Sequence, residues 1–412
     1  MNIDLEKLKL IPFMPNELIE ISEDYVVAAE KGLSAEKDCL KMHPSFLSEK
    51  ISQHNNSSIL AVDIGGTNIR IALFRYDTSK NKLEIADKVS VFETKNAYKQ
   101  GDLTGFIKYI NDYIEEYCSK LNEQVDWIGV SYSFPSDIIK VNNHLDVTRA
   151  NFGKDSWGKG YVITESEVNI TAELRNDLKK RGVQFNKWTA LNDVIALKLA
   201  EVNALAALVV GTGFNLAVMG PDKYLYNTQS SRFTNKLIED NYYWLNDPFY
   251  SQYGISEVQI SGRYLYKRFI DIIKLSDEYD QNFVDLVSTR KSEVISLVLA
   301  DNFTQMEEYK GSEISHSERM QYKLIADALL ERSTDLASAE LSGAIKFSLK
   351  HNPDYNKSKI VVNTDGSVIR KMPNYYQKIL NKTSGILATE FELRIVEDSG
   401  IYGAAYASLL NS

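Results

Sequence analysis

The sequence predicts an α/β protein in which one structural unit occurs twice. Segments with the apolar pattern of buried strands alternate with amphipathic helix patterns, which is typical of a sheet covered by helices. A strand, a turn containing glycine and a second strand occur at Ile59–Leu73 and again at Ala206–Val218. Two such hairpins indicate an internal duplication, and a cleft between two similar halves can hold the phosphates of a nucleotide from both sides.

The composition excludes several classes of protein. The length of 412 residues suggests about two or three domains, and no apolar run is long enough for a transmembrane helix. The first residues lack the basic and apolar regions of a secretory signal. Two cysteines, Cys39 and Cys118, are too few for a disulfide framework or a cysteine-rich zinc site, so we expect reduced thiols and a cytoplasmic protein. A net charge of −9 disfavours non-specific binding to nucleic acid, and we expect neither a nucleic-acid nor a membrane partner.

The first hairpin has the pattern of a phosphate-binding turn. Ile59–Val62 has the apolar residues of a buried strand, and Ile69–Leu73 alternates as a paired second strand does. Gly65–Gly66 predicts a tight turn whose backbone N–H groups can bind an anion, with the Thr67 hydroxyl beside them. Asp63 lies where the strand ends, a place from which a carboxylate can hold water around Mg²⁺. The alternative is an ordinary hairpin with a Gly-Gly turn.

Elements before and after this hairpin complete a first α/β layer. Residues 1–57 form a mainly helical lead-in. After the hairpin we expect a strand over Lys82–Glu93, an amphipathic helix over Asp102–Leu121 and a strand over Val125–Ser133. Ligands of open α/β sheets bind beyond the carboxyl ends of the strands, and Ser133 lies at such an end. The alternative is that Ser133 and the Phe-Pro after it only stop the strand.

The next predicted strand ends in two polar residues. We expect irregular structure over Ile138–Lys154, and then a helix over Glu165–Arg181. A short strand over Trp188–Leu191 leads into Asn192 and Asp193. Asp193 is either the N-cap of the helix that follows or a general base at the mouth of a cleft.

The second half of the chain is mostly helical around a few strands. Its hairpin at Ala206–Val218 turns at Gly211-Thr212-Gly213, and Lys223–Tyr250 shows no clear period. We expect helices over Ile255–Leu275, Arg290–Met306, Ser317–Leu349 and Ile401–Leu410, and strands over Ile360–Asn363 and Phe391–Val396.

In their order along the chain, these motifs resemble those of the eukaryotic-type hexokinase family. The resemblance extends over nearly the whole chain and includes two phosphate motifs, sugar-contacting segments, the segment with the catalytic base and nucleotide-side motifs. The matching segments are Glu30–Leu33, Lys41–Phe46, Asp63–Arg70, Ser133–Pro135, Trp157–Tyr161, Asn192-Asp193, Gly211–Asn215, Glu257–Tyr264, Asp365–Ser367 and Glu397–Gly400.

The resemblance implies the α/β actin-like ATPase (ribonuclease H-like) fold, in which two domains close on a sugar across an interdomain cleft. The expected small domain is 58–191 plus 400–412, and the expected large domain is 1–57 plus 192–399. The implied enzyme is a kinase that transfers the γ-phosphate of ATP, bound with Mg²⁺, to the 6-hydroxyl of a hexose, with glucose as the expected hexose. We expect a monomer or a homodimer.

The functional residues of the family map onto this chain motif by motif. Asp193 would take the proton from the attacking hydroxyl, Arg70 would steady phosphoryl charge, and Asp63 would hold Mg²⁺ through water. The sugar would be bound by Ser133, Phe134, Pro135, Lys159, Asn192, Asn215, Gln229 and Glu257. The nucleotide would contact Asp63, Gly65, Gly66, Thr67, Asn68, Gly211, Thr212, Gly213, Asp365, Gly366, Ser367, Ser399 and Gly400.

Two departures from the family pattern concern the sugar. Gly158 stands where the family has threonine before the lysine, and Gln229 stands where it has a glutamate, so that one acceptor becomes a donor. Both favour a first alternative, a hexokinase-like sugar-binding or regulatory protein with little or no turnover. A second alternative is a kinase of the same fold for another polyol or amino sugar. A third is a chaperone or filament ATPase, which would share the phosphate turns and lack Ser133–Pro135 and Glu257.

Overall fold

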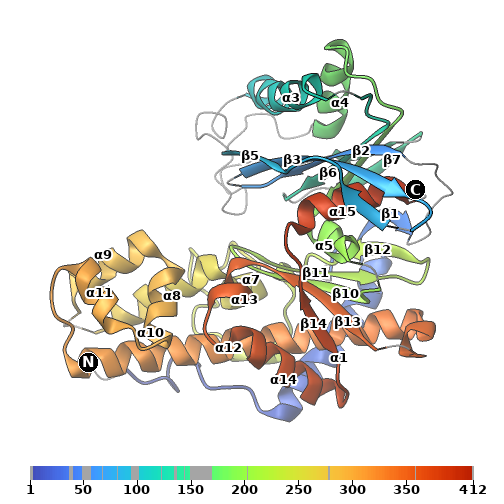
Figure 1. The fold of residues 1–412 in the computed structure, drawn as a ribbon. Coiled ribbons are helices and arrows are strands. Elements are labelled where there is room, and N and C mark those ends of the chain that lie inside the picture. The colour runs from blue at the N-terminus through green and yellow to red at the C-terminus, as the bar shows by residue number, and fades with distance from the viewer. Residues whose placement is uncertain are drawn as a thin grey trace. The chain divides into compact units, whose positions relative to one another are not determined.

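The computed structural model describes residues 3–36, 40–48, 57–66, 68–80, 82–93, 102–121, 123–133, 137–142, 144–148, 169–201, 203–276, 279–357 and 359–410. The chain forms two compact units (Figure 1). Unit 1 comprises Met1–Met42, Leu208–Leu216 and Thr228–Ile395. Unit 2 comprises His43–Ala207, Ala217–Asn227 and Val396–Ser412.

Unit 2 is built on one mixed sheet. Its strands are β2 (Ser58–Ile64), β3 (Asn68–Asp77), β4 (Lys82–Ile85), β5 (Ser90–Glu93), β6 (Trp127–Tyr132), β7 (Asp137–Val141), β8 (His144–Thr148) and β9 (Lys187–Asn192). They follow the order β4-β3-β2-β6-β9-β8-β7, and β5 pairs with β3. The predicted hairpin is confirmed, because β2 pairs with β3 antiparallel, while β2, β6 and β9 are parallel neighbours.

Helices cover both faces of this sheet. They are α3 (Leu103–Ser119), α4 (Ile170–Lys180), α5 (Asp193–Ala200) and α15 (Ser399–Leu409). Figure 1 shows α3 and α4 on one face and α5 and α15 on the other. Unit 2 also contains β1 (His43–Ser48) and β12 (Tyr224–Asn227), which pair antiparallel, and β12 pairs with the end of β11 (Phe214–Met219).

The amphipathic helix predicted over Asp102–Leu121 is confirmed as α3. Asp102 is its N-cap, and the Asp102 carboxylate accepts a hydrogen bond from Gly105 N at 2.6 Å. The predicted apolar residues are buried along one side of the helix, among them Phe106 and Ile110. Helix α3 therefore forms because a good cap and a continuous apolar face coincide.

Helix α15 packs against β6 and α5 with no side chain in between. A Cβ on Gly129 of β6 would lie 2.0 Å from Ala404 O, and a Cβ on Gly403 would lie 2.0 Å from Ala196 O. So close an approach fixes the position of α5 and of the residues at its start. Residues 192–207 belong to unit 2. The domain boundaries expected from the sequence stay a prediction.

Unit 1 is mainly helical. Its helices are α1 (Pro15–Leu33), η1 (Ser230–Arg232), α6 (Lys236–Asp240), α7 (Ile255–Ile260), α8 (Gly262–Ile273), α9 (Gln281–Arg290), α10 (Ser292–Leu299), α11 (Phe303–Lys310), α12 (His316–His351), η2 (Pro353–Lys357), α13 (Ser367–Lys371) and α14 (Tyr375–Leu387). Among the described helices of the chain, none is long and apolar enough to cross a membrane.

A sheet accompanies these helices in the order β11-β10-β13-β14. It combines residues of β10 (Ala206–Val210) and β11 with β13 (Val361–Asp365) and β14 (Glu392–Ile395), and β13 and β14 are parallel. Thr364 Oγ1 of β13 donates a hydrogen bond to Leu208 O of β10 at 2.9 Å.

The central helix of unit 1 is α12. It begins with a capping box, in which Ser315 and Glu318 satisfy each other's backbone N–H groups. A Cβ on Gly343 would lie 2.7 Å from Ser22 O and from Tyr25 Cβ, so α1 lies directly on α12. Helix α14 packs on α12 as well, and α12 thus connects several segments that are distant in sequence.

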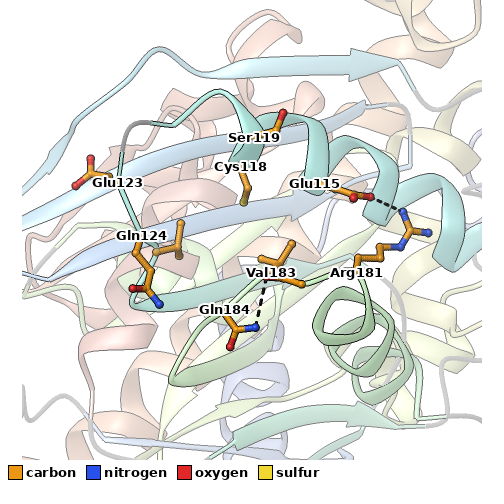
Figure 2. Close-up of a pocket in the computed structure, with 10 residues that line it drawn as sticks. Glu115, Cys118, Ser119, Glu123, Gln124, Arg181, Val183 and Gln184 are labelled. Carbon is orange, nitrogen blue, oxygen red and sulfur yellow. Dashed lines mark hydrogen bonds and ion pairs between the residues drawn. The ribbon is translucent and has the colours of Figure 1, made fainter.

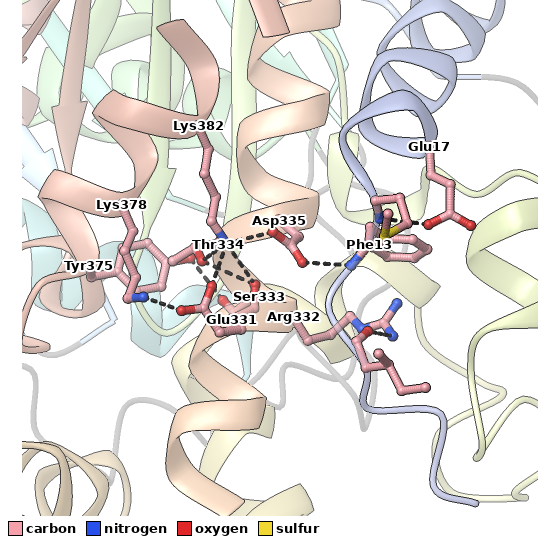
Figure 3. Close-up of polar contacts among 12 residues, drawn as sticks. Phe13, Glu17, Glu331, Arg332, Ser333, Thr334, Asp335, Tyr375, Lys378 and Lys382 are labelled. Carbon is pink, nitrogen blue, oxygen red and sulfur yellow. Dashed lines mark hydrogen bonds and ion pairs between the residues drawn. The ribbon is translucent and has the colours of Figure 1, made fainter. Parts of the chain in front are cut away.

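Polar contacts at the middle of α12 fix two other segments of unit 1 (Figure 3). Arg332 donates to two backbone carbonyls of the segment before α1, at 2.7 and 2.6 Å. Asp335 accepts a hydrogen bond from Phe13 N at 3.0 Å and pairs with Lys382 of α14 at 2.5 Å. Arg332 and Asp335 are each 2% exposed, so loss of one partner of the buried Asp335–Lys382 pair would leave an uncompensated charge.

Some expected elements of unit 2 are wrong in extent. The expected irregular segment Ile138–Lys154 is, in its described part, the hairpin of β7 and β8, which turns at Asn142 with φ of 55°. Strands at the end of a sheet alternate weakly, because few of their side chains are buried. The single strand expected over Lys82–Glu93 is two strands, β4 and β5, which both pair with β3.

Two long helices expected in unit 1 are interrupted. The expected helix Ile255–Leu275 is α7 and α8, because Ser261 is extended with ψ of 149°. Within Arg290–Met306, Lys291 has φ of 56° and separates α9 from α10. The apolar period continues across both breaks, since the shorter helices bury residues in the same core. Regular structure in Lys223–Tyr250, namely β12, η1 and α6, was not predicted.

Candidate functional site

Three neighbouring parallel strands of unit 2 end in polar residues. Asp63 lies at the end of β2, Ser133 directly follows β6, and Asn192 is the last residue of β9. Ser133 Oγ donates a hydrogen bond to Ile64 O at 3.1 Å, which holds the ends of β2 and β6 together. The structure therefore places Asp63, Ser133, Asn192 and the adjacent Asp193 at the carboxyl edge of one sheet, where ligands of such folds bind.

Asp63 pairs with Arg70 across the β2–β3 hairpin. The Asp63 residue is only 7% exposed, and its Oδ2 accepts a hydrogen bond from Arg70 Nη1 at 3.1 Å. Arg70 Nε also lies 3.8 Å from Asp398 Oδ1. Burial raises the pKa of the Asp63 carboxyl, Arg70 opposes that rise, and the negative charge of Asp193 adds to it. Asp63 and Asp193 thus share one electrostatic environment.

The turn between β2 and β3 is as tight as predicted. Gly65 N donates a hydrogen bond to Asn68 O at 3.0 Å, and a Cβ on Gly65 would lie 3.0 Å from the same oxygen. A larger residue at this position would therefore press on the backbone across the turn. Binding of an anion by Gly65, Gly66 and Asn68 stays a prediction.

The start of α15 meets the Asp63 side chain. A Cβ on Gly400 would lie 2.4 Å from Asp63 Cγ and Oδ1. Asp398, which precedes the helix, is in the left-handed conformation with φ of 47°, and Ser399 is buried. The structure thus gathers Ser399 and Gly400 with Asp63 in unit 2, and all three belong to the set of residues predicted to contact the nucleotide.

Asn192 and Asp193 join β9 to α5. The N-cap of α5 is Asn192, whose Oδ1 accepts a hydrogen bond from Val194 N at 3.1 Å, and Asp193 is the first residue of the helix. Asp193 Oδ1 also accepts from Val194 N, at 2.9 Å. The alternative of Asp193 as the N-cap is thus wrong by one residue. The carboxylate of Asp193 stands at a helix N-terminus that α15 holds in place.

In unit 1, the Gly211–Gly213 turn lies against the start of α13. Gly211 N donates to Gly213 O at 2.9 Å, which closes the turn between β10 and β11. Gly366 has φ of 123°, and a Cβ on it would lie 2.3 Å from Val210 O. A Cβ on Gly211 would lie 3.3 Å from Ser367 N. The structure therefore brings together, backbone against backbone, the two segments predicted to contact the nucleotide.

Asp365 directly precedes Gly366, and its carboxylate accepts hydrogen bonds from residues of the same segment. Its Oδ1 accepts hydrogen bonds from Gly366 N at 2.5 Å and from Arg370 Nε at 2.7 Å. Asp365 thereby stabilises the backbone around Gly366. A role of Asp365, Ser367 or Thr212 in binding a nucleotide stays a prediction.

Glu257 contacts the Gly211–Gly213 turn and the residue that follows it. It lies on α7 and is 5% exposed. Glu257 Oε2 accepts a hydrogen bond from Phe214 N at 2.9 Å, and a Cβ on Gly213 would lie 3.3 Å from Glu257 Oε1. The carboxylate therefore has a fixed orientation, directly beside the residue that precedes Asn215.

Asn215 and Gln229 are linked through the backbone. Asn215 Oδ1 accepts hydrogen bonds from Leu216 N at 2.9 Å and from Ser230 N at 3.3 Å. Gln229, the residue before Ser230, is left-handed with φ of 53°, which is uncommon for a residue other than glycine. The structure thus brings together Asn215, Gln229 and Glu257, three of the residues predicted to bind the sugar.

The sequence analysis missed the residues that support this group. A Cβ on Gly254, at the start of α7, would lie 1.9 Å from Ser231 O, so α7 and η1 are in direct contact. Tyr25 of α1 shares a hydrogen bond with Ser230 Oγ at 2.6 Å. A glycine just before a helix pattern is a signal that could have identified Gly254. The sequence gives no such signal for Tyr25.

Four predicted site residues, Thr67, Phe134, Pro135 and Lys159, lie outside the described residues. Within the described part of the chain, no group of three or more His, Cys, Asp or Glu side chains is arranged to hold a metal ion. A divalent cation that keeps most of its water ligands needs only one or two carboxylates, and Asp63 offers one.

A cavity of about 530 Å³ lies elsewhere in unit 2 (Figure 2). Its lining includes Glu115 and Cys118 of α3 and Arg181 and Gln184 after α4. Arg181 is engaged by acidic side chains, and burial raises the pKa of the Cys118 thiol to about 11. None of the predicted site residues lines this cavity.

Each unit offers polar groups of its own. Unit 2 offers a carboxylate at a helix start, an Asp–Arg pair and a serine at strand ends. Unit 1 offers glycine turns, which suit phosphates, and an oriented carboxylate beside two amides, which suit neighbouring hydroxyl groups.

The sequence is similar to known proteins over most of its length. Two family models described as Hexokinase match residues 7–202 and 253–410. Hexokinase-1 of Schizosaccharomyces pombe is 24% identical, over 97% of this chain and 89% of that protein. Hexokinase-1 of Rattus norvegicus is 21% identical over 94% of this chain, and this chain spans 46% of its length.

Solved structures agree in fold. The hexokinase from Schistosoma mansoni complexed with glucose superposes with a TM-score of 0.78 at 19% identity, covering 98% of this chain and 97% of that one. The ROK hexokinase from Thermus thermophilus has a TM-score of 0.53 at 15% identity, with 85% and 97% covered.

Proposed function

Because this chain belongs to the hexokinase family, we propose that it transfers the γ-phosphate of MgATP to the 6-hydroxyl of a hexose. It has the actin-like ATPase fold, and the family makes it a hexose phosphotransferase. ATP as the donor, the 6-hydroxyl as the acceptor and glucose as the first sugar to test belong to the proposal.

The observation that carries the proposal is the position of Asp193. It begins α5 at the carboxyl edge of the unit 2 sheet, beside Asn192 and close enough to Asp63 to raise the pKa of that carboxyl. A hydroxyl that attacks phosphorus must lose its proton, and a positioned carboxylate that accepts it adds about 10²–10⁴-fold in rate. We assign this role to Asp193.

Asp63 and Arg70 fit the phosphate side of the reaction. Phosphoryl transfer depends mainly on alignment and on stabilisation of charge, and Mg²⁺ supplies positive charge at the phosphates when it is bound. Asp63, a buried carboxylate at a strand end, would hold that ion through water. Arg70, which the Asp63 pair keeps oriented, would stabilise charge on the transferred group. The glycine turn at Gly211–Gly213 would hold nucleotide phosphates with its backbone.

The sugar would be bound by amide and carboxylate side chains that have fixed orientations. Glu257 is held by Phe214 N, and Asn215 by Ser230 N, so both are oriented before a ligand arrives. A site whose buried polar groups need the hydroxyl groups of the sugar rejects analogues that lack them. In unit 2, Ser133 and Asn192 at the ends of β6 and β9 would also offer polar groups to the sugar.

A second candidate function is sugar binding with little or no turnover. Gln229 favours it, since an amide accepts fewer hydrogen bonds than the carboxylate that the family pattern has there.

One experiment distinguishes the kinase from the sugar-binding protein. ADP release is measured with MgATP against glucose, mannose, fructose, glucosamine and N-acetylglucosamine, with a control that lacks sugar. We expect release that depends on a hexose. Binding of a sugar by calorimetry with no release above the control would contradict the kinase and support the second candidate. Release that is the same without sugar would point to an ATPase.

A further inference from the structure

Glu340 lies inside unit 1, directly behind the segment that carries Glu257. It belongs to α12 and is 0% exposed. Glu340 Oε1 lies 2.5 Å from Oγ of Ser256, the residue before Glu257. Glu340 Oε2 is buried and has no hydrogen-bond partner among the residues that the structure describes.

The hydrogens at Ser256 can be counted. Ser256 Oγ is within hydrogen-bond distance of two oxygens, Glu340 Oε1 at 2.5 Å and Phe233 O at 2.8 Å. A hydroxyl has one hydrogen, and a backbone carbonyl can only accept. Ser256 therefore donates to Phe233 O, and the second hydrogen bond needs a proton on Glu340.

The burial of Glu340 also favours its protonated form. An ionised carboxylate that leaves water and has one partner is strongly unfavourable, so the group takes up a proton instead. Burial, with the nearby negative charge of Glu257, raises the pKa of the Glu340 carboxyl well above its ordinary value.

We propose that Glu340 is a protonated carboxylic acid and a positioning residue for sugar binding. It donates to Ser256, and Ser256 donates to Phe233 O, so that one hydrogen-bond path joins α12, the helix with Glu257 and the segment that follows Gln229. This role rests on the proposed function, because it assumes that Glu257 and Gln229 contact the sugar.

The neutral state of Glu340 matters for Glu257. Two ionised carboxylates so close together in the interior would repel, and one of them would take up a proton. With the proton on Glu340, this residue adds no second negative charge behind the segment that carries Glu257.

A second hydrogen-bond path includes the residues on both sides of Gln229. Tyr25 OH, Ser230 Oγ and Thr228 Oγ1 follow one another at 2.6 Å each, and Thr228 donates to Leu216 O at 2.9 Å. Because the last acceptor is a carbonyl, every donor in the series is determined, and Tyr25 is the first. This second path includes both neighbours of the left-handed residue Gln229, and the first path reaches the chain four residues later, at Phe233 O.

The test compares variants that keep or lose a neutral donor. Glu340→Gln has an N–H that can donate to Ser256, whereas Glu340→Leu has none, and Ser256→Ala removes the same path while it leaves Glu340 in place. Glu331→Gln, on the same helix and paired with lysines, is the control. The readouts are the infrared band of protonated carboxylic acids at neutral pH, the calorimetric Kd for glucose or whichever hexose of the panel binds, and kcat at saturating sugar.

We expect a carboxylic acid band in the native protein that Glu340→Gln removes and Glu331→Gln does not. We expect Glu340→Gln to leave the Kd nearly unchanged, whereas Glu340→Leu and Ser256→Ala raise it about tenfold with little change in kcat. Absence of the band, or a Kd in Glu340→Gln as high as in Glu340→Leu, overturns the proposal while sugar binding by the native protein stands. A native protein that binds no sugar of the panel instead overturns the proposed function, and the positioning role with it.

Discussion

The carboxylate of Asp63 rests directly on Gly400. No side chain fits between them, because a Cβ on Gly400 would lie 2.4 Å from Asp63 Oδ1 and 2.7 Å from Oδ2. The contact joins the end of β2 to the start of α15, two segments at opposite ends of the chain. Because of this contact, the Glu397–Gly400 motif near the carboxyl terminus lies beside Asp63, the residue that begins the first phosphate motif.

The first prediction concerns this contact. Gly400→Ala displaces the Asp63 carboxylate, and a displacement of about 1 Å at reacting groups can lower the rate about 10²-fold. We therefore expect kcat to fall by about that factor, with a smaller change in the Kd for sugar. Gly385→Ala on α14 is the matched control, since no atom lies within 4 Å of its added Cβ. Equal kcat values for both variants would contradict the role of Asp63.

The second prediction concerns the sugar. Gln229→Glu restores the carboxylate of the family pattern, and hydrogen bonds to a charged acceptor are stronger than those to an amide. We expect the Kd for the preferred hexose to fall about tenfold in titration calorimetry. Gln377→Glu, exposed on α14, controls for the added charge. A Kd that rises or stays constant in Gln229→Glu would show that residue 229 does not contact the sugar.

The third prediction concerns stability and pH. Burial in α5 lowers the pKa of Lys198 to about 7 from its ordinary value of 10.5. Between these two pH values the unfolded chain binds more protons than the folded one, so the free energy of unfolding rises with pH. We expect Lys198→Met to remove part of this rise, measured by urea unfolding at several pH values from 7 to 10.

Lys180→Met, at an exposed position of α4, should unfold with the pH dependence of the native protein. If Lys198→Met and the native protein show parallel curves, Lys198 is charged in the folded state and the burial argument fails.

Local patterns predicted those parts of the fold that depend on local chemistry. The turn at Gly65, the start of the helix at Asp102 and the polar pair Asn192-Asp193 each lie within a few residues of the strand or helix that they end or begin. The expected edge of the sheet in unit 2 is confirmed for the same reason, since parallel strands align their carboxyl ends.

Contacts between distant segments were not predictable in this way. Gly403 is one of several small residues in its helix pattern, and only the structure shows that its lack of a side chain lets α15 touch α5. Glu340 is a lone acidic residue among small ones, and its partner Ser256 is 84 residues away in sequence. The breaks at Ser261 and Lys291 were missed because the apolar period passes through them.

The fourth prediction tests the central claim, that Asp193 is the base in transfer of phosphate from ATP to a hexose. The measurement is transfer of ³²P from [γ-³²P]ATP to the hexose in one turnover, for the native protein and for Asp193→Asn, which keeps a side chain that can accept from Val194 N. We predict a sugar 6-phosphate from the native protein and a rate at least about 10²-fold lower for Asp193→Asn, with unchanged sugar binding. Labelled inorganic phosphate in place of sugar phosphate, or full transfer by Asp193→Asn, would contradict the claim.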